Sequence, residues 1–201
     1  MKKSILFLYI LSILLLACNS GEINKESTDE QTKELTENEV KKYKEKGLNF
    51  AMLTQKALGE NLMKQIKING TREAVSYCNL NALSIVDSME NVLNIEISRI
   101  TDKPRNSFSQ ASIEELKYIE TFKYHLSNEK ILQPLVKEVG DKISFYSPIK
   151  TNGMCLQCHG NKESNIKYET LSVIDSLYPE DKAKGYLSNQ IRGMWKIEFE
   201  K

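Results

Sequence analysis

The chain has 201 residues, of which 40% are hydrophobic, and this is enough for one domain with a buried core. Its 28 lysines and arginines nearly balance 27 aspartates and glutamates. A net charge of +1 provides no basic field, which excludes a general nucleic-acid-binding surface, so no nucleic acid partner is expected.

The N-terminus predicts export and lipid attachment. Two lysines precede an apolar run over residues 5–16, which is too short for a stable membrane-spanning helix and is typical of a signal peptide. The run ends in Leu-Leu-Ala-Cys at residues 15–18, which is similar to the lipobox of bacterial lipoproteins. We therefore expect a lipoprotein signal peptide over residues 1–17 and a lipid on Cys18. An ordinary secreted protein cleaved elsewhere is the alternative.

The mature chain is expected to divide into a tether and one domain. Residues 18–39 contain few apolar side chains and an excess of acidic ones, which predicts a flexible tether. Residues 40–201 fall within the usual size of one domain. The lipid would place the protein in the bacterial cell envelope. Asn19 is not the best-known inner-membrane retention signal, which favours the outer membrane, with the domain facing the periplasm or the cell surface.

Hydrophobic periodicity and turn residues predict an α+β fold for this domain. In chain order the predicted elements are helices over 40–68 and 71–93, a strand over 94–100, a loop over 104–110, a helix over 112–124, strands over 136–139 and 143–146, a helix over 168–177 and a strand over 194–199. Gly70 suits the end of the first helix because glycine readily adopts positive φ. Trp195, Ile197 and Phe199 are expected on one face of the last strand.

The run Cys-Leu-Gln-Cys-His-Gly at residues 155–160 has the spacing of a site for covalent c-type haem attachment. Cys155 and Cys158 would add to the haem vinyl groups, and His159 would become an axial ligand of the iron. A zinc half-site lacks two further ligands, and a redox dithiol usually opens a helix after a strand. One covalently attached haem c is the expected cofactor, and its attachment outside the cytoplasm agrees with export.

Cys78 is the one cysteine that lipidation and haem attachment leave over. A lone exported thiol is a small apolar core residue, an intermolecular disulfide partner or a metal ligand, and its place on an apolar helical stripe favours burial. His125 and four methionines, Met52, Met63, Met89 and Met194, are other candidates for the sixth iron ligand, and a vacant position is a further alternative. Met154 is too close in the chain to the attachment motif to reach the opposite face of the haem. Spacing alone does not choose among them.

Several further segments carry a family resemblance. They are Ala74–Ala82, Ile97–Arg99, Pro104–Ser107, Cys155–Gly160, Tyr178–Tyr186 and Ile191–Gly193. In order and approximate spacing these segments resemble a family of c-type haem domains with a PAS-like sensor fold, long catalogued as a domain of unknown function. The resemblance covers about two thirds of the chain. It implies a PAS-like antiparallel sheet with N-terminal helices packed around the haem, and Cys78 as the second axial ligand.

Three arginines are candidate partners for the haem propionates, which need cations when they are partly buried. They are Arg99, Arg105 and Arg192, and the last two are favoured because they belong to the segments that carry the family resemblance. The alternative is that all three are solvated surface residues.

These features predict a membrane-anchored protein that transfers electrons to an unknown redox partner. A thiolate ligand stabilises ferric iron and would lower the reduction potential. The alternative is a redox or gas sensor that signals to a separate partner, with a small gas displacing Cys78. A peroxidase would need an open iron site and an acid–base group, so we expect no enzyme activity.

Overall fold

In the computed structural model, which describes residues 34–201, the chain begins with a long bent helix, α1 (Glu37–Leu93). The helix begins three residues before the predicted start at residue 40, within the segment predicted to be tether. The reason is a capping box, in which Thr36 accepts from the Glu39 amide and the Glu39 carboxylate accepts from Thr36. No helix among residues 34–201 has the length and apolar character to cross a bilayer. The apolar run 5–16 and Cys18 lie outside the described residues.

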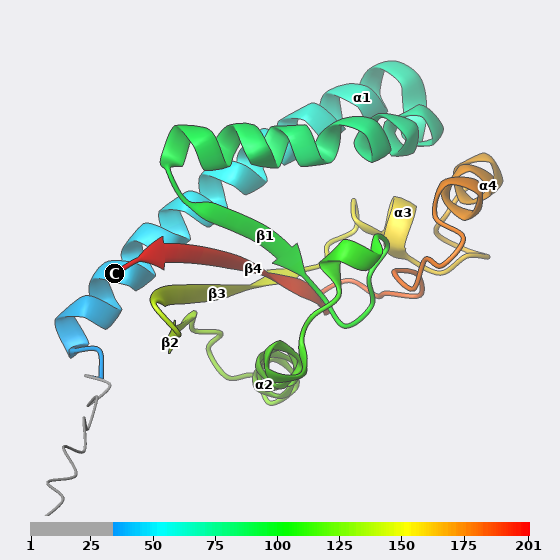
Figure 1. The fold of residues 1–201 in the computed structure, drawn as a ribbon. Helices are drawn as coiled ribbons and strands as arrows, with labels where there is room; N and C mark the ends of the chain where they lie inside the picture. Colours follow the sequence, from blue (N-terminus) through cyan, green and yellow to red (C-terminus); the bar gives the residue numbers. More distant parts are fainter. Residues whose placement is uncertain (1–33) are drawn as a thin grey trace, which may run out of the picture. The chain divides into compact units, whose positions relative to one another are not determined.

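The bend in α1 is at Gly70, which has φ 79° and ψ 175°. Only glycine adopts this conformation readily, so the sequence interrupts the helix where the prediction placed a boundary. The second segment returns beside the first (Figure 1), and the Tyr77 hydroxyl donates to Asn61 Oδ1 at 3.4 Å between them. The two predicted helices are thus confirmed, as the two halves of α1.

The strands form a single antiparallel sheet in the order β1-β4-β3-β2. They are β1 (Glu96–Ile100), β2 (Leu135–Val139), β3 (Lys142–Lys150) and β4 (Ile191–Glu200). The other elements are the 3-10 turn η1 (Ser107–Ser109) and helices α2 (Ile113–Ser127), α3 (Leu156–His159) and α4 (Tyr168–Leu177). Gly140 forms the β2–β3 turn with φ 63°, as a two-residue hairpin loop requires. The η1 turn corrects the predicted loop over 104–110, because the Asn106 side chain accepts from the Phe108 amide and caps a turn there.

Each face of the sheet is covered by a helix (Figure 1). On one face, Phe145, Trp195, Ile197 and Phe199 pack with Ala51 of α1. Alternation along the strands places a second set on the other face against α2, namely Ile100, Tyr146, Ile191 and Met194 against Ile119 and Phe122. The predicted shared face of Trp195, Ile197 and Phe199 is confirmed. The α+β, PAS-like fold class is confirmed as well.

A third apolar cluster lies beyond the end of the sheet and holds the bend of α1. Val75 of α1 packs with Ile166 and with Ile174 of α4. Next to the bend, the buried hydroxyls of Thr71 and Thr170 form a hydrogen bond of 2.6 Å. Since Cys158 also packs against this cluster, the position of α1 is coupled to that of the cysteine motif.

We predict that Gly70→Ala destabilises the protein by about 1–3 kcal/mol, the cost of a strained backbone conformation. An added Cβ at Gly70 meets no atom within 4 Å, so the change in stability would reflect the backbone conformation and not a steric clash. Gly59 lies inside the first half of α1 and is equally free of contacts, so Gly59→Ala should stabilise the protein by about 0.5–1 kcal/mol. Urea unfolding of both variants measures the difference, and equal effects would contradict the assigned role of Gly70.

Candidate functional site

The cysteine motif forms one turn of helix at the end of the molecule where α3 and α4 lie (Figure 1). Cys155 occupies the N-cap position, and the His159 amide donates to the Cys155 carbonyl at 2.9 Å. Cys155 and Cys158 therefore lie about one helical turn apart on the same side. Both thiols are free and half-buried. Gly160 follows, and a Cβ there would clash with the Leu156 carbonyl and Asn165, so glycine is required.

The segment 183–186 is clamped to this turn by three hydrogen bonds. The Gly185 amide donates to the Gly160 carbonyl and the Tyr186 amide donates to the His159 carbonyl, both at 2.9 Å. The third bond links the His159 side chain to the Ala183 carbonyl at 2.8 Å from Nδ1. A carbonyl oxygen only accepts, so Nδ1 carries the proton. Nε2, on the opposite side of the ring, is then the atom with a lone pair.

His159 is neutral at neutral pH. Burial, followed by the nearby charges of Arg105 and Arg192, lowers its pKa well below the ordinary value of 6.5. The hydrogen bond to Ala183 raises the pKa, but less than the other causes lower it. A neutral imidazole with one nitrogen bonded to the backbone is the form in which histidine binds metals.

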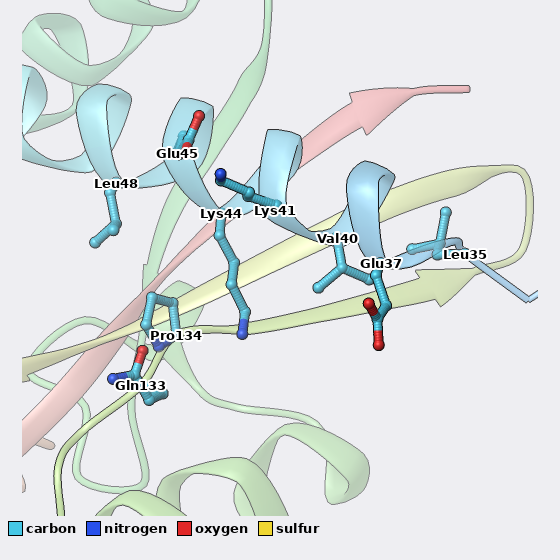
Figure 2. Close-up of a pocket in the computed structure, with 9 residues that line it drawn as sticks. All are labelled: Leu35, Glu37, Val40, Lys41, Lys44, Glu45, Leu48, Gln133 and Pro134. Atoms are coloured by element: carbon cyan, nitrogen blue, oxygen red, sulfur yellow. The ribbon is translucent and has the colours of Figure 1, made fainter.

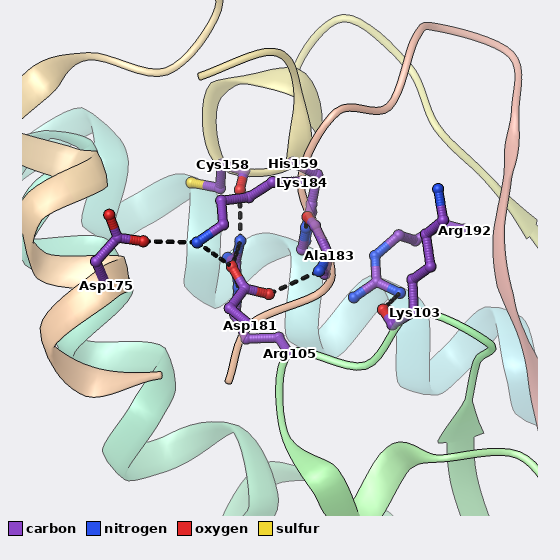
Figure 3. A network of polar contacts seen from close by, with 9 residues as sticks. All are labelled: Lys103, Arg105, Cys158, His159, Asp175, Asp181, Ala183, Lys184 and Arg192. Carbon is purple, nitrogen blue, oxygen red and sulfur yellow. Dashed lines mark hydrogen bonds and ion pairs between the residues drawn. The ribbon is translucent and has the colours of Figure 1, made fainter. Parts of the chain in front are cut away.

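A buried carboxylate, Asp181, holds the clamp in place (Figure 3). Its Oδ1 accepts from the Ala183 amide at 2.8 Å, two residues along the chain. Its Oδ2 accepts from Arg105 Nε at 3.2 Å and Nη2 at 3.1 Å, and Lys184 Nζ lies 3.3 Å away. The Asp181 side chain is 0% exposed, so these donors replace water completely.

Arg105 carries the same network to the cysteine motif. Its Nη2 also donates to the Cys158 carbonyl at 2.6 Å, as Figure 3 shows. The Lys182 amide donates to the Pro104 carbonyl at 3.0 Å, so the two loops are joined by the backbone as well. Arg105, predicted as a propionate partner, thus already has two partners within the chain.

Cys78 lies on the second half of α1, opposite the cysteine motif. Its thiol is half-buried, and its pKa is raised by burial while Arg99 and Arg105 act in the opposite direction. Cys78 is also close enough to Cys158 to contribute to the raised pKa of that thiol, after burial and the opposing effect of Arg105. The structure therefore brings together Cys78 and the motif, which are far apart in sequence.

Arg99 and Arg192 border the same region. Arg99 keeps an exposed surface, yet burial lowers its pKa. Arg192 donates through Nη1 to Thr101 Oγ1 at 3.0 Å and to the Lys103 carbonyl at 3.2 Å, whereas its buried Nε has no hydrogen-bond partner in the described part of the chain. No acidic side chain forms an ion pair with either arginine there.

Five sequence-predicted site residues come together here, namely Cys78, Cys155, Cys158, His159 and Arg105, with Arg99 and Arg192 at the edge. Cys18 lies outside the described residues. Sequence reasoning missed Asp181 and the Ala183 carbonyl. Asp181 lies in a resembling segment, but nothing in its spacing signals an ion pair with Arg105. Residues 34–201 contain no group of three or more His, Cys, Asp and Glu side chains arranged for a metal ion.

Comparisons with known proteins identify relatives of this fold. Residues 24–199 match the model of a protein family described as Tll0287-like. A crystal structure of the cyanobacterial heme-protein Tll0287 aligns with a TM-score of 0.60 and 17% sequence identity. The alignment covers 78% of this chain and 93% of that chain. No curated protein matches this sequence. At this identity the likeness to the solved structure establishes the fold.

We predict that Asp181→Asn lowers the free energy of unfolding at pH 7 by about 3 kcal/mol, because it leaves Arg105 buried without its counter-charge. Burial alone would raise the pKa of Asp181, but Arg105 and the Ala183 amide outweigh burial and hold the pKa below the ordinary 3.8. The ionised carboxylate therefore stabilises the fold above that value, and the stabilisation is lost as the pH falls through the lowered pKa.

Urea unfolding at pH 7 and at about pH 3 measures both effects, and the difference between wild type and Asp181→Asn should shrink at the lower pH. Asp175→Asn is the matched control. Asp175 also pairs with Lys184, at 2.6 Å, but is 52% exposed, so the loss should stay below about 1 kcal/mol. A loss in the control equal to that in Asp181→Asn would show that the Arg105 pair is not the important contact.

Proposed function

The chain belongs to the Tll0287-like family, and on that basis we propose that it is an exported c-type haem protein that transfers single electrons. One haem would be attached covalently to Cys155 and Cys158, with His159 and Cys78 as the axial ligands of the iron. A solved structure that shares this fold is that of a heme-protein, which supports haem as the cofactor. Covalent attachment and the electron-transfer role are parts of the proposal.

The residues of the site fit a haem. Two free thiols lie one helical turn apart, with a neutral imidazole directly after them. Arg99 and Arg192 have no acidic partner among residues 34–201, and the buried Arg192 Nε has a donor to spare, so both are suited to the propionates. Arg105 would instead support the motif through Cys158 and Asp181.

The observation that carries the proposal is the state of His159. Its Nδ1 proton is held by the Ala183 carbonyl, so Nε2 is left as a lone-pair donor with the ring fixed. Two backbone hydrogen bonds fix the turn against residues 183–186, and the bond from Nδ1 to the Ala183 carbonyl holds the ring itself. A metal ligand needs such a fixed orientation, because the direction of its lone pair sets the strength of the bond.

Cys78 is the proposed second protein ligand of the iron. Burial raises the pKa of the Cys78 thiol, and the charges of Arg99 and Arg105 oppose that effect in favour of the thiolate, which is the form that binds iron. When bound, the haem supplies an iron that accepts and returns one electron. The chain holds both ligands on packed elements, α1 and α3, so little rearrangement accompanies a change in charge. That property suits a carrier of electrons.

A redox or gas sensor is the second candidate, and it is favoured by the half-buried Cys78 thiol, whose pKa is raised by burial. The protonated thiol is the weaker metal ligand, so its release would open a position for a small gas. A sensor of this kind would release Cys78 on reduction and pass the change to a separate partner protein. An electron carrier would keep Cys78 in place in both redox states.

The proposal includes a cell-envelope location. The apolar run 5–16 and the Leu-Leu-Ala-Cys sequence at 15–18 support export and a lipid on Cys18, with the domain outside the cytoplasm. Covalent haem attachment takes place in the same compartment. Cys18→Ser should move the protein from the membrane fraction to the soluble fraction, and retention in the membrane fraction would contradict lipid anchoring at this residue.

The absorption spectrum of the purified ferric protein tests the ligand set. We predict that Cys78→Ala shifts the Soret band and raises the midpoint potential, because an anionic donor to ferric iron is lost. Cys155→Ser with Cys158→Ser should abolish haem that survives acid–organic extraction. Ser76→Ala, on the same helix, is the control and should leave both spectrum and potential unchanged.

Binding of carbon monoxide to the reduced protein distinguishes the two candidate functions. An electron carrier should show no spectral change when carbon monoxide is added to the reduced form. Tight binding of carbon monoxide with loss of the Cys78 signature would favour the sensor. A wild-type spectrum in Cys78→Ala would remove Cys78 from the coordination sphere, and absence of haem from the wild type would overturn the whole proposal.

A further inference from the structure

The first half of α1 carries a concentration of positive charge that the haem site does not use. Residues 41–67 contain seven lysines and two glutamates. The remaining described residues, 34–40 and 68–201, contain 17 lysines and arginines and 21 aspartates and glutamates. The described domain is therefore divided into one strongly basic helix segment and a mildly acidic remainder.

Six of these lysines lie on the outer side of α1. They are Lys41, Lys42, Lys46, Lys56, Lys64 and Lys67, and all are exposed. Helical geometry separates them from Gly47, Ala51 and Thr54, the buried residues of the same segment. We call this surface the lysine face. Lys56 approaches Glu60 at 3.9 Å, and none of the other five forms an ion pair with a residue of the described chain.

Exposed apolar side chains lie among the lysines. Met52 is 62% exposed, Met63 44%, Leu53 40% and Leu48 38%. Positions 48, 52, 56, 59, 63 and 67 follow one another at intervals of three or four, so Leu48, Met52 and Met63 share a stripe with Lys56 and Lys67. Figure 2 shows Leu48 on the turn that follows Lys44, beside a groove of about 440 Å³ that both residues line together with Pro134.

We propose that the lysine face docks on an anionic lipid surface. Lysines surrounding a stripe of apolar side chains match the two layers of such a surface, because the ammonium groups meet lipid phosphates and the apolar side chains enter the headgroup boundary. The segment from Lys41 to Lys67 is roughly 40 Å long and lies flat on a plane without bending. This adds a membrane-contacting surface to the proposed cell-envelope location. It rests on that proposed function, in which the lipid on Cys18 keeps the domain near the membrane.

Other occupants fit the lysine face less well. A second copy of the chain would place lysines of both copies against each other, with two glutamates per copy to offset them. An acidic protein would match the charges, but not the exposed methionines and leucines between them. The lipid surface satisfies both properties.

Docking on the lysine face would fix the orientation of the domain. A lipid on Cys18 alone holds the domain near the membrane without choosing which side faces it. Contact through the first half of α1 turns this helix towards the lipid and leaves α2, on the opposite side of the sheet (Figure 1), directed away from it.

Vesicle sedimentation tests the proposal with residues 34–201, which contain every described element and all three core clusters. This protein lacks Cys18, so binding cannot arise from the lipid anchor. We expect it to sediment with vesicles in which about one third of the lipid is phosphatidylglycerol, but not with pure phosphatidylcholine, and to be released by salt. The fourfold variant of Lys42, Lys46, Lys64 and Lys67 to glutamine should bind on the order of 100-fold more weakly.

A variant with the same change in charge is the matched control. It replaces the exposed Lys137, Lys150, Lys162 and Lys167 with glutamine, all outside α1, and should bind within about threefold of wild type. Equal losses in both variants, or equal binding to phosphatidylcholine alone, would overturn the proposal. Absent binding to anionic vesicles, with tight binding of an acidic protein or a dimer that needs the same four lysines, would also overturn it. None of these results depends on the haem, so failure here leaves the proposed function open.

Discussion

The ion pair between Asp181 and Arg105 is the contact on which the arrangement of the site depends. One buried carboxylate receives the Ala183 amide and two nitrogens of Arg105, with Lys184 nearby. Through Ala183 it fixes the carbonyl that holds the His159 proton, and through Arg105 it reaches the Cys158 carbonyl. A buried charge that loses its partner is costly, so removing either member of the pair destabilises both loops that position the motif. The tautomer of the histidine thus follows from a charge pair two residues away from its acceptor.

Local signals were sufficient to predict most of the fold. Glycine at residue 70, the capping box at Ser112 and Glu115, and the alternation of Trp195, Ile197 and Phe199 each act within a few residues, and all three features occur in the structure. The predicted start of α1 at residue 40 and the predicted loop over 104–110 were wrong. In both places a side-chain cap extends helical structure into a polar stretch. The order of strands in the sheet depends on pairing over long distances, which periodicity does not encode.

The residues of the candidate site also differ in whether local sequence predicts their positions. Cys155, Cys158 and His159 are adjacent in sequence, so their relation could be predicted from spacing alone. The proximity of Cys78 could not, because it results from the return of the second half of α1 and the packing of Val75 against α4. Arg105 was predicted for its charge, and its actual partner, Asp181, lies 76 residues away. A contact over this separation becomes visible only once the two loops are folded together.

The glycine bend in α1 has a mechanical consequence for the proposed iron ligand. Cys78 lies eight residues beyond Gly70, which is roughly 12 Å along a helix. With that lever arm, a tilt of about 10° at the bend would displace the thiol by about 2 Å, comparable with a metal–sulfur bond of about 2.3 Å. The Thr71–Thr170 hydrogen bond lies one residue beyond Gly70 and holds the bend against α4. The position of the Cys78 sulfur is therefore set by the geometry of a bend that lies about two helical turns away along α1.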